Sequence, residues 1–140
     1  MLIVTSLTAV PLAILFQYLS LNVIKSRRRE GIGIGDGGNE AVIRANRAQG
    51  NLLEYSFVFL GLLALAETNG MRWWILAPFA IAFCAGRAMH AFSVLYSETA
   101  ENGREGLARY VWRIRAMTIT LLVIPVMAFL VVASLILPWL

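Results

Sequence analysis

The chain has 140 residues, enough for one domain, and it is 59% hydrophobic and only 14% charged, with a mean hydropathy of +0.73. This composition excludes an ordinary soluble domain and predicts an integral membrane protein. The isoelectric point is near 9.8, and the chain has twelve Lys and Arg residues. We do not expect a nucleic-acid partner, because no soluble fold is predicted that could present these residues, and because basic residues near membrane helices set the topology.

Four apolar segments follow one another along the chain, each about as long as the roughly 20 residues that a helix needs to cross a bilayer. They are residues 2–24, 48–68, 73–95 and 110–137. The first is uncharged, and because neither a positive leader nor a small-residue cleavage site is evident, we expect it to be a retained helix. All four tryptophans lie near segment ends, where indole rings prefer the interface. The short connections predict an all-α, antiparallel four-helix bundle, a single transmembrane domain over 1–140.

The charges on the connections predict the orientation of the bundle. The first connection, about 25–46, carries five Lys or Arg residues, and the third, about 97–109, carries Arg104 and Arg109. The short second connection carries only Arg72. The positive-inside rule therefore predicts that the first and third connections are cytoplasmic and that both termini lie outside.

A glycine-rich stretch, residues 31–38, lies in the first connection. A nucleotide-binding loop would need a strand before it, a helix after it and a closing Lys-Ser or Lys-Thr, and that closing pair is absent. We therefore expect this stretch to be a flexible connection.

Polar side chains open the second apolar segment. Arg47, Asn51 and Glu54 are spaced i, i+4 and i+7, so a helix places them on one face. Gln49 lies off this line, and Tyr55 lies at its edge. Ionisable groups at membrane depth cost about 2.5 to 3.5 kcal/mol each on insertion scales, so they usually face a bundle interior and pair with other groups. The stripe therefore predicts polar partners on other helices.

Candidate partners lie on the third and fourth segments. Arg87 and His90 are spaced i and i+3 in the third, and Arg113 and Arg115 open the fourth. We expect all of these groups to point toward one polar pocket at the inner leaflet. Such a pocket suits a small zwitterionic ligand with carboxylates and an amine, and an arginine beside a ligand sulfur would stabilise a thiolate. The alternative is that Glu54 and the arginines only hold the helices together, at about 0.6 to 2 kcal/mol for each hydrogen bond.

Several other residues have structural explanations. The chain has one histidine, His90, and one cysteine, so we expect neither a disulfide framework nor a metal site. By itself, His90 is interpreted as an interior hydrogen-bonded residue rather than a proton shuttle. Glu67 is expected to form an interfacial ion pair with Arg72. Small residues such as Gly86 are expected to permit close approach of helices.

The polar residues of the second, third and fourth segments, taken together, resemble the pattern of a known family. The set comprises Arg47, Gln49, Asn51, Glu54 and Tyr55 in the second segment, Arg87 and His90 in the third, and Arg113 and Thr120 in the fourth. With this set the chain resembles the MAPEG family, the membrane-associated proteins in eicosanoid and glutathione metabolism. The likeness covers nearly the whole chain and includes the Gly-Asp-Gly-Gly of residues 35–38, which bacterial-looking members share. The second-segment motif most resembles that of leukotriene C synthase.

The resemblance implies a homotrimer in the lipid bilayer, with the bacterial inner membrane as the expected location and glutathione bound between neighbouring subunits on the cytoplasmic side. It implies that Arg113 lies near the sulfur and promotes the thiolate, that Glu54 meets the amino group, and that Arg27 or Arg28 closes the site. Family enzymes transfer the thiolate to a hydrophobic small molecule or reduce a lipid hydroperoxide. The glutathione-binding residues that the resemblance implies are Arg47, Gln49, Asn51, Glu54, Tyr55, His90, Arg27 and Arg28.

Two functions from different classes follow. The favoured one is a glutathione-dependent membrane transferase or peroxidase that acts on hydrophobic electrophiles or lipid hydroperoxides. The other is a non-catalytic lipid-binding or scaffold protein of the same fold. We retain this alternative because Phe57 replaces a family proline and because His90 and Val94 replace family tyrosines. A small transporter or channel subunit is disfavoured, since the charges gather at one side of the membrane.

Overall fold

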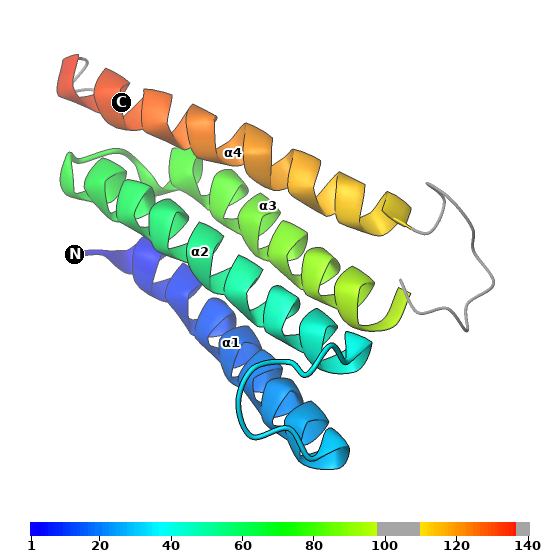
Figure 1. Cartoon of the computed structure of the whole chain (residues 1–140). Helices are drawn as coiled ribbons and strands as arrows, with labels where there is room; N and C mark the ends of the chain where they lie inside the picture. The colour runs from blue at the N-terminus through cyan, green and yellow to red at the C-terminus, as the bar shows by residue number, and fades with distance from the viewer. Residues whose placement is uncertain (98–109, 137–140) are drawn as a thin grey trace.

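The computed structural model of the chain describes residues 1–97 and 110–136. Four long helices lie side by side, and successive helices run in opposite directions (Figure 1). The helices are α1 Ile3–Glu30, α2 Glu40–Thr68, α3 Trp73–Phe92 and α4 Val111–Ile136, and α3 continues into a π-helical turn, η1, at Ser93–Ser97. Each of the four is long and apolar enough to cross a membrane, with η1 counted as part of the third. The predicted all-α membrane four-helix bundle is confirmed.

The first two helices extend beyond the apolar segments that hydropathy marks. The α1 helix continues through the basic run to Glu30, and α2 begins at Glu40, so the first connection is residues 31–39 and not 25–46. The α1 helix ends at Gly31, whose left-handed φ of 67° lets Ile32 N donate back to Arg27 O over 2.9 Å. Apolar composition detects only the part of a helix that faces lipid, which explains the difference. The third connection, with Arg104 and Arg109, lies outside the described residues.

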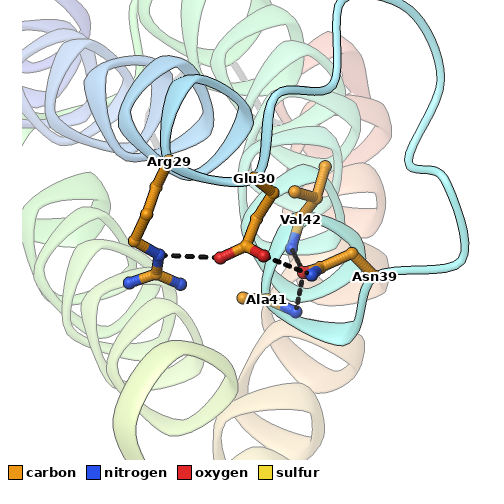
Figure 2. A network of polar contacts seen from close by, with 5 residues as sticks. All are labelled: Arg29, Glu30, Asn39, Ala41 and Val42. Atoms are coloured by element: carbon orange, nitrogen blue, oxygen red, sulfur yellow. Dashed lines mark hydrogen bonds and ion pairs between the residues drawn. The ribbon is translucent and has the colours of Figure 1, made fainter.

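The first connection, which its glycines predict to be flexible, is hydrogen-bonded at both ends. Asn39 caps α2: its Oδ1 accepts from the backbone N–H groups of Ala41 and Val42, over 2.9 and 3.2 Å. Figure 2 shows how Glu30 joins the two helices. One of its carboxylate oxygens accepts from Arg29 Nε over 2.8 Å, and the other accepts from Asn39 Nδ2 over 2.9 Å.

The opposite end of the bundle is closed by Glu67, whose predicted ion pair with Arg72 does not form. The Glu67 carboxylate accepts from the backbone N–H groups of Val4 and Thr5, over 2.8 and 2.9 Å, and from Thr5 Oγ1 over 2.8 Å. The first N–H groups of a helix have no partner within the helix, so α2 supplies the cap that α1 lacks. The Arg72 guanidinium instead stacks 4.8 Å from the Trp74 ring.

All four helices contribute buried side chains to the bundle core. Phe59 of α2 and Phe83 of α3 are fully buried, and their rings stack with centroids 4.0 Å apart. Gly86 of α3 lies so close to α4 that a Cβ built there would be 3.3 Å from Ile119 Cγ2 and 3.4 Å from Ala116 O. The prediction that Gly86 permits close helix approach is therefore consistent with its surroundings. Many large apolar side chains cover the outer faces of all four helices, as a bilayer requires.

Candidate functional site

A cavity of about 530 Å³ opens at the bundle end where α2 and α4 begin. We call it the polar pocket. Residues of the first connection, α2, α3, η1 and α4 contribute to it, and α1 does not. Its lining residues are Asp36, Ile43, Asn46, Arg47, Gly50, Asn51, Glu54, His90, Val94 and Arg113.

One wall of the polar pocket is the predicted stripe on α2. Arg47, Asn51 and Glu54 all line the cavity, as their i, i+4, i+7 spacing on one helical face requires. Arg47 and Glu54 are exposed, and neither forms an ion pair with another described residue. Their charged groups therefore remain available to a ligand.

The facing wall comes from the third and fourth segments. His90, near the end of α3, is buried but lines the cavity, and Val94 follows it on η1. Arg113, in the first turn of α4, also lines the cavity, and its guanidinium stacks 4.8 Å from the Tyr110 ring. The pocket thus presents two guanidinium groups, an imidazole and two carboxylates to one space.

Arg87 does not line the pocket; it lies behind it, with only 1% of its surface exposed. Its Nη1 donates to Asn51 Oδ1 over 2.6 Å, its Nη2 donates to Thr120 Oγ1, and its guanidinium lies 5.0 Å from the Tyr55 ring. Arg87 therefore links α2, α3 and α4. Because arginine can only donate, it binds the Asn51 oxygen and leaves the Asn51 amide N–H groups to other acceptors.

Four further residues from the sequence prediction lie outside the pocket of their own chain. Gln49 faces α1, where its Nε2 donates to Ser20 Oγ over 2.7 Å. Arg27 and Arg28 line a separate shallow depression at the end of α1, with Arg27 Nη1 3.4 Å from Gly33 O. Tyr55 packs beneath Arg87 and against the core. The resemblance implied that these four residues contact a ligand between neighbouring subunits, and within one chain they do not line the polar pocket.

Arg115 also departs from the expectation. Its side chain is exposed and stacks 5.5 Å from the Trp112 ring instead of lining the cavity. The reason is helical: Arg115 lies two residues after Arg113, and positions i and i+2 point to different faces.

Two polar lining residues were not predicted. Asn46 lies at i and Gly50 at i+4 on one face of α2, and this spacing would have revealed Asn46 had α2 been expected to begin before residue 48. Asp36 lies in the glycine-rich connection, where no periodicity indicates direction, so no sequence signal pointed to it. Among residues 1–97 and 110–136, no group of three His, Cys, Asp or Glu side chains is arranged to hold a metal ion.

The chain is similar in sequence to known membrane proteins. The model of the MAPEG family matches residues 5–133. The chain is also similar to the proteins named Inner membrane protein YecN in two strains of Escherichia coli. Each is 34% identical over 89 residues, which cover 64% of this chain and 68% of the relative. No solved structure matches the chain.

Proposed function

The chain belongs to the MAPEG family, and from this premise we propose that it binds glutathione in the polar pocket and acts as a membrane transferase or peroxidase. The second substrate is a hydrophobic electrophile or a lipid hydroperoxide that enters from the bilayer. The single observation that carries the proposal is the polar pocket itself, which gathers Arg47, Asn51, Glu54 and Arg113 around one cavity. Its volume of about 530 Å³ lies within the range of small-molecule sites.

The charges of the pocket match those of glutathione. The tripeptide carries two carboxylates, one ammonium group and a thiol. Arg47 offers a planar pair of donors to a carboxylate, and Glu54 accepts from the ammonium group. Asn51 lines the cavity, and its amide nitrogen, which the bond from Arg87 does not use, donates to a peptide carbonyl or carboxylate of the ligand. Each ligand group thus has a protein group of complementary chemistry.

Arg113 is the proposed catalytic residue. A guanidinium beside the sulfur stabilises the thiolate, which is the nucleophile, whereas the neutral thiol reacts poorly. Arg113 lies across the cavity from the α2 stripe, in the first turn of α4. A ligand whose peptide lies along α2 would therefore direct its sulfur toward α4. The resulting site at the end of the bundle lets a lipid substrate meet a water-soluble cofactor.

The proposal includes a homotrimer with the site completed by a neighbouring subunit. Arg27, Arg28 and Gln49 belong to the implied glutathione-binding set but face away from the pocket of their own chain. They are placed on and beside α1, where they can serve the pocket of an adjacent subunit. Tyr55 would then contact the ligand from its place beneath Arg87.

We also propose the inner membrane as the location, with the first and third connections in the cytoplasm. The relative's name, Inner membrane protein YecN, supports the location. The Lys and Arg residues at the end of α1, at the start of α2 and on the third connection support the orientation.

A second candidate is a non-catalytic, lipid-binding or scaffold member of the family. The observation that favours it is the wall formed by His90 and Val94, which contributes no phenol group to the cavity. Val94 cannot donate a hydrogen bond, so the ligand sulfur receives fewer donors than tyrosines would give.

Thermal unfolding of the purified protein with glutathione tests the proposed function. Millimolar reduced glutathione should raise the melting temperature, because a ligand at about 100 times its Kd stabilises the folded state by roughly 2.7 kcal/mol. No shift would refute glutathione binding. A shift without turnover of electrophilic lipids or lipid hydroperoxides would favour the non-catalytic candidate. Arg47→Ala, which removes a lining guanidinium, should reduce the shift, whereas Arg29→Ala at the exposed end of α1 should preserve it.

A further inference from the structure

The first connection holds one acidic side chain at the edge of the polar pocket. Asp36 is the only residue of 31–39 that lines the cavity. Its backbone and side chain are both fixed by short turns: Asp36 Oδ1 accepts from Gly38 N over 3.0 Å, and Asp36 O accepts from Asn39 N over 3.0 Å. Asn39 in turn caps α2 and bonds Glu30 at the end of α1, as Figure 2 shows. The position of Asp36 is therefore set by both helices.

Packing within the connection also restrains this turn. Gly37 has a φ of 59°, and a Cβ built on it would lie 3.0 Å from Ile32 Cδ1. The turn thus lies directly against the Ile32 side chain, and a larger residue at position 37 would push it away. The two glycines that flank Asp36, at positions 35 and 37, both have positive φ, which other residues rarely adopt.

The carboxylate of Asp36 retains acceptor capacity for a ligand. Only Oδ1 is bonded, to Gly38 N, and no ion pair joins Asp36 to any residue in the described ranges. Glu54 on α2 is the second carboxylate of the same cavity and likewise has no such pair. An ammonium group has three donors in a compact head, so two carboxylates on different elements can bind it together.

We propose that Asp36 is a specificity-determining residue that binds the ammonium group of the ligand together with Glu54. This inference rests on the proposed function, because it takes the γ-glutamyl ammonium of glutathione as the group bound. The glycine-rich connection then selects against ligands that carry only carboxylates and a thiol, since Asp36 would face them without a cation. The connection is thus part of the binding site.

Calorimetric titration of the purified protein with two ligands tests this role. The first is glutathione, and the second is the analogue whose α-amino group is replaced by hydrogen. Asp36→Asn keeps the bond to Gly38 N and removes the charge, so it should weaken glutathione binding by roughly 3- to 10-fold. Binding of the deamino analogue should change less than about 2-fold or become tighter. The hydroxyl of Asp36→Ser can also accept from Gly38 N. This second variant should weaken glutathione binding relative to binding of the deamino analogue by the same factor, and it serves as a check if Asn perturbs the turn.

Glu40→Gln is the matched control. Glu40 is an exposed carboxylate at the same end of the bundle that pairs with Arg44 over 2.9 Å and does not line the cavity. Its substitution should leave both affinities unchanged. An equal loss for both ligands in Asp36→Asn, or no loss for glutathione, would overturn the role of Asp36 and leave the proposed function standing. If the unaltered protein binds neither ligand, the proposed function fails, and this inference fails with it.

Discussion

Arg87 of α3 and Asn51 of α2 are joined by a hydrogen bond of 2.6 Å from the arginine Nη1 to the asparagine Oδ1. The bond crosses from a fully buried side chain to one that lines the polar pocket. It fixes the asparagine amide, and it ties the helix that carries most of the pocket to the center of the bundle. Stability and site geometry therefore depend on the same guanidinium.

The hydrogen bond from Arg87 to Thr120 should contribute measurably to the stability of the bundle. Thr120→Val removes the acceptor of Arg87 Nη2 at nearly constant volume, so the free energy of unfolding should fall by about 1 to 2 kcal/mol. Detergent-induced unfolding followed by circular dichroism measures this change. Thr118→Val is the control, because the exposed Thr118 bonds only Ile114 O of its own helix, and it should change the value by less than about 0.5 kcal/mol. Equal effects of the two variants would contradict a role for the Arg87 bond.

Glu67 should hold the start of α1 in place. Glu67→Ala leaves the N–H groups of Val4 and Thr5 without their acceptors, so the free energy of unfolding should fall by roughly 1 to 3 kcal/mol. Amide hydrogen exchange at Val4 and Thr5 should accelerate more than exchange in the middle of α1. Unchanged exchange at these two amides would show that the cap does not form in the membrane.

Gly86 should tolerate little added volume. Gly86→Leu would force α3 away from Ile119 and Ala116 of α4, and should lower the free energy of unfolding by about 1 to 3 kcal/mol. Gly61→Leu is the control: Gly61 is exposed on α2, with no atom within 4 Å of a built Cβ. That control should leave the stability of the single subunit nearly unchanged. Similar losses in both variants would argue against close α3–α4 packing as the cause.

Arg113 should act on the sulfur more than on binding. Arg113→Ala should leave glutathione affinity largely intact and abolish the ultraviolet absorbance of the bound thiolate, because the stabilising charge is lost. Difference spectroscopy with glutathione, with S-methylated glutathione as the blank, measures the thiolate. An unchanged thiolate signal would remove Arg113 from the catalytic role.

Glu54 should bind the ligand ammonium group. Glu54→Gln removes the charge and keeps the shape, and should weaken glutathione binding by roughly 1 to 3 kcal/mol. Calorimetric titration measures the loss, with Glu40→Gln as a carboxylate control outside the pocket. An unaffected affinity would support the structural alternative, in which the carboxylate serves only the bundle.

The four membrane helices and one wall of the site follow from the local amino-acid pattern. Apolar length is a property of each segment alone, so residues 2–24 or 48–68 indicate a spanning helix without any knowledge of neighbours. The stripe of Arg47, Asn51 and Glu54 is equally local, because 3.6 residues per turn put them on one face whatever lies opposite. Both predictions depend only on the period and length of one helix.

The contacts between different helices, in contrast, depend on how the helices pack. Glu67 binds the start of α1 instead of Arg72, because unpaired backbone N–H groups are costlier at a membrane than an unpaired exposed arginine. Arg87 turns into the core and Asp36 reaches the pocket because helix rotation and the path of the first connection bring them there. Such pairings depend on the relative register of separate elements, and no spacing within one segment encodes that register.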